Sequence, residues 1–277
     1  MKPQRIFITG GASGLGRELA IHYARNGAKV LIGDIDKDRA ATVMKDLIQM
    51  GAESHFLLCN VRKEGDLQQA ASWLHENWAG VDVVFNNAGV AQMGPIADIS
   101  LDDWNWVVDI NLLGVVRGCK VFIPMLRAQG GGKIVNIASM AGLLYLPKAA
   151  AYNATKAAVV ALSETLQLEL ANDNIQVTVA CPGFFRTDLA KHMRATDAEA
   201  ERFTKRLVER ARVGPGEIAR QIFEGVSRGD THILTHADAR RTWYLKRHLP
   251  YAWYRRLVRR QVEKIEARMQ RRKEVAA

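Results

Sequence analysis

Short apolar segments alternate along the chain with longer stretches in which apolar residues recur at helical spacing. The apolar segments are nearly continuous, as expected for strands buried on both faces of a sheet. They cover residues 5–9, 29–34, 54–59, 81–86, 133–139, 176–180 and 232–235. The stretches with helical spacing include residues 15–26, 38–50, 65–78, 101–129 and 150–171. This alternation predicts an α/β fold, a doubly wound parallel sheet of about seven strands with helices on both faces.

Basic residues are unevenly distributed over the 277 residues. The chain has a formal net charge of +10, and residues 240–277 hold 13 Lys and Arg against three Glu. The first 239 residues are therefore neutral overall. We expect one folded domain over residues 1–239 and a basic amphipathic helical tail over residues 240–277.

The sequence lacks the features of a secreted or membrane-spanning protein. Its start, MKPQRIFITG, leads directly into the first strand without the apolar core of a signal peptide. No run approaches the roughly 18 apolar residues of a membrane span, so we expect a cytoplasmic protein. Cys59, Cys119 and Cys181 lie among apolar residues. Their spacing fits neither a disulfide framework nor a metal site, and we expect buried free thiols and no bound metal.

The loop after the first strand is rich in glycine, with Gly10, Gly14 and Gly16 in the segment TGGASGLG. Because it follows a predicted strand and opens a predicted helix, its free N–H groups and the helix dipole favour a pyrophosphate. Gly10 permits the tight turn, Gly14 lets the backbone approach the anion, and Gly16 allows close packing of the helix on the strand. The alternative is a glycine-rich turn that binds nothing.

Asp34 ends the second strand, about 20 residues past this loop, where a carboxylate accepts a hydrogen bond from a ribose 2′-OH. The same carboxylate would repel a 2′-phosphate, and none of the residues 11–13 is basic. We therefore predict NAD(H) as cofactor in preference to NADP(H). The alternative is a turn or capping role, although Asp36 is the better candidate for the helix cap.

Tyr152 and Lys156 lie four residues apart near the start of a predicted helix and therefore share one of its faces. An ammonium beside a phenol favours the phenolate and lowers its pKa from about 10. Ser139 ends a predicted strand, where its hydroxyl could bind the substrate oxygen that Tyr152 protonates or deprotonates. These residues predict a general acid/base with an oxygen-positioning partner. The alternative is an ordinary helix with Tyr and Lys one turn apart.

Polar and small residues follow two further strands, at residues 60–61 and 86–89. At the carboxyl ends of parallel strands such residues line the ligand crevice. Asn111 lies in a long helical region among apolar neighbours. A buried amide bonded to backbone would explain it without a catalytic role.

Together these motifs resemble the short-chain dehydrogenase/reductase family. The glycine loop is similar to its TGxxxGxG cofactor loop, residues 86–89 to its NNAG element, and residues 182–187 (PGFFRT) to its PGxxxT segment. The resemblance covers residues 5 to 235. It implies a Rossmann-type sheet with a C-terminal helical extension, and an oxidoreductase that orients a substrate for hydride transfer to or from the cofactor.

The resemblance also implies roles for single residues. Tyr152 would exchange a proton with the substrate oxygen, and Lys156 would lower the pKa of Tyr152 and bind the nicotinamide ribose. Ser139 would hold the carbonyl or alcohol, and Asn111 would anchor a water in a proton relay. The family more often has Asp at position 60, but the Asn60 amide oxygen still accepts a hydrogen bond. Residues implied at the cofactor are Gly10, Ser13, Gly14, Leu15, Gly16, Asp34, Asn60, Val61, Asn87, Ala88, Gly89, Tyr152, Lys156, Pro182, Gly183, Phe185 and Thr187.

The segments expected to line the substrate pocket are apolar, which favours a lipophilic alcohol or carbonyl compound. The alternative is that some of these side chains belong to the core or to a subunit interface. Residues 191–212 are charged with a helical pattern and resemble the mobile lid of the family. The expected lining residues are Val90, Ala91, Met93, Met140, Leu143, Leu144, Tyr145, Leu146, Phe184 and Phe185.

The tail departs from the family pattern. Val258, Val262, Ile265 and Met269 fall at helical spacing, with arginines on other faces and aromatic residues at 243, 244, 251, 253 and 254. A basic amphipathic helix of this kind suits peripheral association with an anionic membrane. It also suits a partner helix, an oligomer contact or nucleic acid, and the remaining alternative is a solvated face.

Two classes of function follow. The first is an NAD-dependent oxidoreductase, assembled as a homodimer or homotetramer through the helices at 101–129 and 150–171, as the resemblance implies. The second is a non-catalytic NAD-sensing scaffold that docks to membrane or nucleic acid through its tail. The complete set Asn111, Ser139, Tyr152 and Lys156 favours the enzyme. No nucleic-acid partner is expected, because the neutral body has no recognised binding motif.

Overall fold

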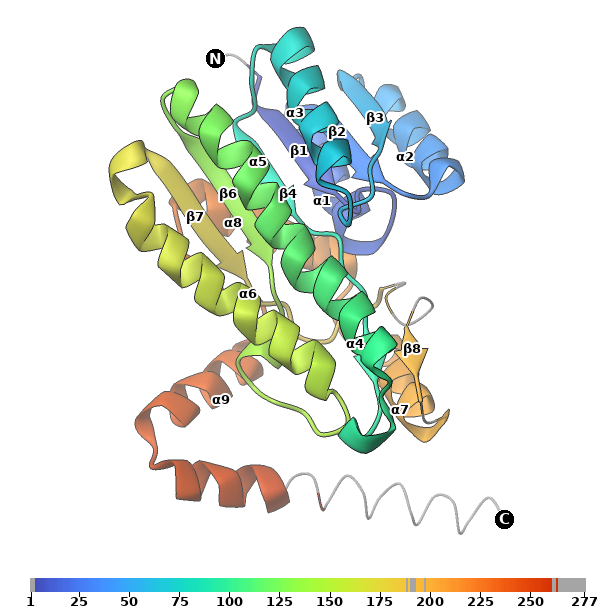
Figure 1. The fold of residues 1–277 in the computed structure, drawn as a ribbon, viewed down its shortest axis with the longest axis vertical. Helices are drawn as coiled ribbons and strands as arrows, with labels where there is room; N and C mark the ends of the chain where they lie inside the picture. The colour runs from blue at the N-terminus through green and yellow to red at the C-terminus, as the bar shows by residue number, and fades with distance from the viewer. Residues whose placement is uncertain (1–2, 188, 190–192, 197, 261–262, 264–277) are drawn as a thin grey trace. The chain divides into compact units, whose positions relative to one another are not determined.

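A parallel sheet of seven strands forms the centre of the computed structural model, which describes residues 3–187, 189, 193–196, 198–260 and 263 (Figure 1). The strand order is β3-β2-β1-β4-β6-β7-β9, and every pairing in this sheet is parallel. The predicted fold class is confirmed. The strands are β1 (Arg5–Thr9), β2 (Lys29–Asp34), β3 (Ser54–Leu58), β4 (Val83–Asn86), β6 (Gly132–Ile137), β7 (Ile175–Ala180) and β9 (His232–Ile233).

Helices cover both faces of the sheet. In Figure 1, α3, α5 and α6 lie on the face toward the viewer, and α1 and α8 lie behind it. Apolar residues of α1, α2 and α8 form one core cluster with residues of β1, β2 and β4. The helices of residues 1–235 are α1 (Gly14–Arg25), α2 (Lys37–Gln49), α3 (Glu64–Trp78), α4 (Leu101–Val108), α5 (Gly114–Ala128), α6 (Ala150–Glu169), α7 (Ala198–Glu209) and α8 (Pro215–Arg228).

The burial of the central strand on both faces explains why the strand segments are continuous apolar runs in the sequence. Ile6, Phe7 and Ile8 of β1 are fully buried, since β1 has a strand on each side and helices above and below. The strand order reverses between β1 and β4. At such a switch point the chain leaves the two strands toward opposite faces, which opens a crevice at their carboxyl ends.

The observed element boundaries correct several predicted ones. Strand β4 begins at Val83 instead of residue 81, β6 covers 132–137 instead of 133–139, and β9 ends at Ile233 instead of residue 235. The helix predicted over 101–129 is two helices, α4 and α5, joined by a π-helical turn at Asp109–Leu113. Periodicity could not reveal this turn, because one extra residue in a helical turn leaves the apolar pattern nearly unchanged.

Residues 236–277 form a second compact unit. Within it the structure describes helix α9 (Ala237–His248) and a further helical stretch over 251–260. Leu249 and Pro250 separate them; proline has no N–H to donate and disfavours helix at the residue before it. Of the predicted apolar stripe only Val258, which is half-buried, lies within the described residues. No helix in the described part of the chain has both the length and the apolar character needed to cross a bilayer.

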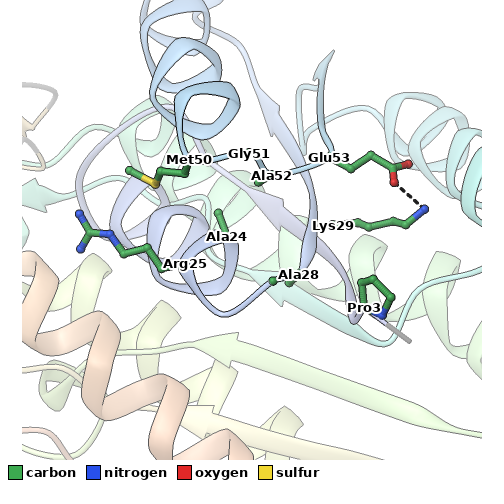
Figure 2. Close-up of a pocket in the computed structure, with 10 residues that line it drawn as sticks. Pro3, Ala24, Arg25, Ala28, Lys29, Met50, Gly51, Ala52 and Glu53 are labelled. Carbon is green, nitrogen blue, oxygen red and sulfur yellow. Dashed lines mark ion pairs between the residues drawn. The ribbon is translucent and has the colours of Figure 1, made fainter. Parts of the chain in front are cut away.

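A surface cavity of about 550 Å³ lies at the amino end of β2 (Figure 2). Arg25, at the end of α1, and Met50, after α2, contribute to its wall. Lys29 and Glu53 form an ion pair of 2.7 Å on its other side. Parallel strands end together, so this cavity is at the opposite edge of the sheet from the glycine loop and the predicted catalytic residues.

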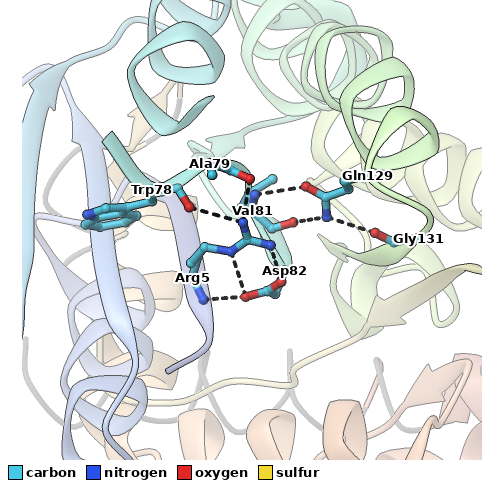
Figure 3. Close-up of polar contacts among 7 residues, drawn as sticks. All are labelled: Arg5, Trp78, Ala79, Val81, Asp82, Gln129 and Gly131. Atoms are coloured by element: carbon cyan, nitrogen blue, oxygen red, sulfur yellow. Dashed lines mark hydrogen bonds and ion pairs between the residues drawn. The ribbon is translucent and has the colours of Figure 1, made fainter. Parts of the chain in front are cut away.

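Arg5 lies at the same edge of the sheet, between β1 and β4 (Figure 3). Its guanidinium donates to Asp82 at 2.6 and 3.0 Å and to the carbonyl oxygens of Trp78 and Ala79 at 3.2 and 2.7 Å. Asp82 also accepts from the backbone N–H of Arg5 at 2.7 Å. Gln129 bonds to both backbone groups of Val81 beside it. These hydrogen bonds hold the C-terminal end of α3 against the start of β4.

We predict that Asp82→Ala lowers the free energy of unfolding by about 1–3 kcal/mol, because it leaves donors of Arg5 without an acceptor. Asp173→Ala is the matched control. It removes the acceptor of a more exposed arginine, Arg127, and should change stability by less than about 1 kcal/mol. Urea unfolding of both variants measures the difference, and equal losses would contradict the prediction.

Candidate active site

The glycine loop adopts the conformation that its sequence predicts. Gly10 has φ +64°, a left-handed value that favours glycine. A Cβ on Gly16 would overlap the carbonyl oxygen of Gly10, so the start of α1 approaches the loop as only glycine permits. Ser13 is the N-cap of α1, and its side chain makes no capping hydrogen bond. The first turn of α1 therefore presents N–H groups to an anion, and the loop fits a dinucleotide pyrophosphate.

Two side chains join this loop to the loop after β4. The Thr9 hydroxyl accepts from the backbone N–H of Asn87 at 3.0 Å and of Ala88 at 3.1 Å. The Asn87 amide donates to the carbonyl oxygens of Thr9 at 2.9 Å and of Gly10 at 3.1 Å. Asn87, predicted as a cofactor contact, therefore also determines the shape of the glycine loop. Thr9 was not singled out from the sequence, although its place at the end of β1 was the available signal.

Asp34 lies at the carboxyl end of β2 beside the glycine loop. Its carboxylate accepts from the N–H groups of Ala12 at 2.9 Å and of Asp36 at 3.0 Å. These two bonds hold the carboxylate at the loop, where the ribose of a dinucleotide would lie. Asp36 caps α2 as expected, accepting from the Arg39 N–H at 3.0 Å, and also forms an ion pair with the Arg39 side chain.

Residues 60 and 61 follow β3 on the same side of the sheet. Asn60 donates its backbone N–H to Asp66 at 2.9 Å, and its side-chain oxygen accepts from Arg62 N–H at 3.1 Å. An amide oxygen has a second lone pair, so this turn leaves acceptor capacity. Val61 is buried against Gly114 at the start of α5.

Asn111 lies in the π-helical turn between α4 and α5 and is fully buried. Its side chain accepts from Val90 N–H at 2.8 Å and donates to Val90 O at 2.9 Å and to the Thr155 hydroxyl at 3.4 Å. Asn111 thereby ties the loop after β4 to α6, the helix that carries Tyr152. π-helical turns occur frequently at functional sites. Thr155 was not identified from the sequence as part of this arrangement.

Ion pairs hold the same turn from outside. Asp109, the first residue of the π-helical turn, accepts from Arg62 and from Arg117, each at 2.7 Å. Partial burial raises the pKa of Asp109, but the hydrogen bonds from the two guanidinium groups outweigh it and the pKa is lowered. The carboxylate is thus kept charged, which keeps the chain on both sides of Asn111 in place.

Lys156 is buried, with only 4% of its surface exposed. Its ammonium donates to the Ile137 carbonyl oxygen, at the end of β6, at 2.9 Å. A Cβ on Gly89 would lie 3.4 Å from the Lys156 Nζ and 3.2 Å from the Asn111 Oδ1, so these three residues meet at one point. Burial lowers the pKa of Lys156 to about 8, and a weaker interaction with Cys181 opposes this shift.

Tyr152 lies one turn before Lys156, and the Lys156 Nζ is 5.9 Å from the centre of the Tyr152 ring. Ser139, just beyond β6, is hydrogen-bonded to Tyr152. Burial raises the pKa of Tyr152, and the Ser139 hydrogen bond lowers it by a smaller amount. The pKa is raised overall, because desolvation is the larger effect, and the lowering expected from Lys156 stays a prediction. Tyr152 as a whole residue is half-buried.

The segment after β7 lies across the same edge of the sheet. The carbonyl oxygen of Pro182 accepts from Met140 N–H at 2.8 Å and from the Ser139 hydroxyl at 3.4 Å. A Cβ on Gly14 would lie 2.9 Å from the Thr187 Oγ1, which places this hydroxyl over the glycine loop. Phe185 packs against the core behind it. The chain from 182 to 187, including Gly183, thus connects the glycine loop with the Ser139 loop.

A small second sheet covers the substrate side. Strand β5 (Gln92–Met93) pairs with β8 (Arg194–Ala195) in parallel. Arg194 forms an ion pair with Asp103 at 2.9 Å and lies 4.1 Å from the centre of the Trp106 ring, both on α4. Arg194 thus connects part of the predicted lid to α4. The lid residues 191, 192 and 197 lie outside the described residues.

Comparisons with known proteins agree with this geometry. Residues 4–198 match the family model for short chain dehydrogenases. The chain is 33% identical over 258 residues to the oxidoreductase SadH of Mycobacterium tuberculosis, which covers 91% of this chain and 92% of SadH. The chain belongs to the short-chain dehydrogenase/reductase family.

Solved structures of this family have the same fold. A short-chain dehydrogenase/reductase from Burkholderia phymatum in complex with NAD superposes with a TM-score of 0.85 at 32% identity, over 89% of this chain and 93% of that protein. An alcohol dehydrogenase from Thermococcus sibiricus in complex with 5-hydroxy-NADP gives a TM-score of 0.73 at 25% identity, over 84% and 96%. The protein is therefore an NAD(P)-dependent oxidoreductase of this family, and the roles of its single residues stay predictions.

We predict that Lys156→Met changes the pH dependence of stability. In the unfolded chain a lysine keeps its proton up to about pH 10.5, whereas folded Lys156 loses it above about pH 8. Between these values the unfolded state binds more protons, so rising pH stabilises the wild type by up to about 1.4 kcal/mol per pH unit through this residue. The variant lacks this contribution.

Urea unfolding between pH 7.5 and 10 measures the effect. The free energy of unfolding of the wild type minus that of Lys156→Met should grow as pH rises from 8. Lys120→Met is the matched control, because the Lys120 side chain is 65% exposed, and its difference should stay constant. A constant difference for Lys156→Met as well would show that burial does not lower its pKa.

Proposed function

We propose that this protein is an NAD(H)-dependent alcohol dehydrogenase or carbonyl reductase acting on a lipophilic substrate. The observation that carries the proposal is the arrangement of Ser139, Tyr152 and Lys156 beside the glycine loop. Nicotinamide, when bound, supplies the hydride acceptor or donor. In the oxidative direction the Ser139 hydroxyl holds the substrate oxygen and the Tyr152 phenol oxygen takes its proton. In reduction Tyr152 returns that proton.

Lys156 and Asn111 act on this proton exchange from the protein side. The buried Lys156 ammonium lies one helical turn from Tyr152, and its positive charge would favour the phenolate. Asn111 forms hydrogen bonds with both backbone groups of Val90 and with the Thr155 hydroxyl, and so connects the loop after β4 with α6. We propose that it also anchors the water through which Tyr152 exchanges its proton with solvent.

Asp34 supports NAD(H) over NADP(H). Its carboxylate is fixed by Ala12 N–H beside the loop, where a 2′-phosphate would meet a negative charge. Two of the nearest basic side chains already have acidic partners. Arg39 is paired with Asp36, and Arg17 with Glu18 and Asp46.

The chemistry of the substrate side supports a lipophilic alcohol or carbonyl. Tyr145, Leu146 and Phe184 are large apolar side chains that are 54%, 37% and 40% exposed, in the two loops that follow β6 and β7. Arg186 donates to the carbonyl oxygens of Ala211 and Arg212, and Arg194 is paired with Asp103, so protein groups engage these two charges. Met93 packs against Ala149 and lid residues and is thus partly structural.

We also propose a homodimer or homotetramer that buries the outer faces of α4, α5 and α6. Leu168 of α6 is 83% exposed and Leu101 of α4 is 79% exposed, and this interface would remove both apolar side chains from water. Sedimentation equilibrium of the wild type measures the assembly size.

The proposed function predicts that Tyr152→Phe lowers kcat by about 10²–10⁴-fold, because the substrate loses its proton acceptor. NADH absorbance in a panel of apolar secondary and primary alcohols with NAD measures this. A separate NADH titration distinguishes loss of the proton acceptor from loss of cofactor binding. Tyr145→Phe, which removes the hydroxyl of the exposed tyrosine nearby, is the matched control and should retain activity.

Retained turnover in Tyr152→Phe would reject the proposed acid/base. If the wild type binds NADH but oxidises no alcohol and reduces no carbonyl in the panel, the scaffold function is favoured instead.

Cofactor selectivity gives a separate prediction. Asp34→Asn removes the negative charge, and the ratio of NADH to NADPH affinity should fall by about ten-fold or more, equivalent to ~1.4 kcal/mol of binding free energy. Fluorescence titration with each cofactor measures the ratio without a substrate. Asp36→Asn, on the adjacent helix cap, should leave it nearly unchanged. A wild type that binds NADPH more tightly would contradict the role given to Asp34.

A further inference from the structure

Residues 237–260 form a strongly basic surface. They hold eight Lys and Arg against one acid, Asp238, whereas residues 1–239 are neutral overall. We call residues 237–260 the basic surface. Seven of the eight bases are arginines, and six of these form three pairs of adjacent residues, namely Arg240 and Arg241, Arg255 and Arg256, and Arg259 and Arg260. These six side chains are exposed.

Large apolar side chains are exposed on the same surface. Tyr251 is 70% exposed, Trp253 65% and Leu257 49%. Trp253 and Leu257 are four residues apart in the helical stretch 251–260, so they share one side of it, and Arg256 and Arg260 flank them at helical spacing. Because Trp253 and Leu257 are largely exposed, burial in the core of the fold does not account for these apolar side chains.

Basic and aromatic side chains also lie against each other within this unit. The Arg247 guanidinium is 5.0 Å from the centre of the Trp243 ring, and the Lys246 ammonium is 6.0 Å from that of Tyr254. Aromatic rings that combine an apolar body with a polar edge, beside cations, are typical of the boundary between lipid headgroups and acyl chains.

We propose that the basic surface docks on an anionic lipid bilayer. The arginines would lie among anionic headgroups, and Trp253, Leu257 and Tyr251 would enter the boundary beneath them. Docking is peripheral, because no helix in the described residues is suited to cross a bilayer. A nucleic acid would also attract the charge, but it would not require exposed Leu257 beside Trp253. The proposal is independent of the proposed catalytic function.

Co-sedimentation of the full chain with vesicles tests it. The vesicles are pure phosphatidylcholine or phosphatidylcholine with 30% phosphatidylglycerol. We expect binding to the anionic vesicles only, and release when NaCl rises from 0.05 to 0.5 M. Arg256→Gln with Arg260→Gln should weaken binding by about 25-fold, at roughly five-fold for each basic residue near the surface. Trp253→Ser should weaken it at unchanged charge.

Matched controls lie on the catalytic domain. Arg25→Gln with Lys45→Gln removes the same charge from exposed positions, and Ile48→Ser removes a side chain that is 63% exposed. Both should bind vesicles as the wild type does. Circular dichroism and NADH binding confirm that each variant is folded.

Three results would overturn the proposal. The first is equal binding to neutral and anionic vesicles, or to neither. The second is loss of binding in the control variants to the same extent as in the basic-surface variants. The third is binding to duplex DNA with the same sensitivity to Arg256 and Arg260 but no response to Trp253→Ser, which would identify nucleic acid as the partner.

Discussion

The crevice of this enzyme depends on the contact between the loops that follow β1 and β4. Thr9 accepts two backbone N–H groups of the second loop, and Asn87 returns two hydrogen bonds to the first. Side chains of this size bridge the loops only because Gly10 and Gly16 bring the backbones together. The same four bonds therefore shape the anion site and fix the chain that leads to Gly89, beside Lys156 and Asn111.

Lys156 is a cationic side chain that is buried in the site. A buried ammonium is destabilising, and the hydrogen bond to Ile137 O compensates only in part, because its acceptor is neutral. The pKa of Lys156 is therefore lowered while that of Tyr152 is raised. Without a bound ligand the two pKa values therefore move apart, since that of Lys156 falls from 10.5 to about 8 and that of Tyr152 rises from 10.0. Ligands that add acceptors near Lys156 would raise its pKa again, and the retained charge would favour the phenolate.

Local motifs made most of the site predictable. The glycine loop, Asp34 and the pair Tyr152 and Lys156 depend on short spacings, and each lies where strand–helix alternation places it. What the sequence could not show depends on contacts between distant segments. The π-helical turn at Asn111 is held by Asp109 through Arg62 and Arg117, up to 47 residues away. The pairing of β5 with β8 joins segments about a hundred residues apart, and no local pattern signals it.

The pKa of Tyr152 shows why spacing alone does not determine chemistry. Helical periodicity correctly places an ammonium one turn away, but the sign of the shift depends on how much water each group loses. Desolvation depends on all the segments that pack around a group, and therefore on the whole fold. In residues 237–260 the arginines and several large apolar side chains are both exposed. There the sequence pattern and the structure agree, since Trp253 and Leu257 are 65% and 49% exposed.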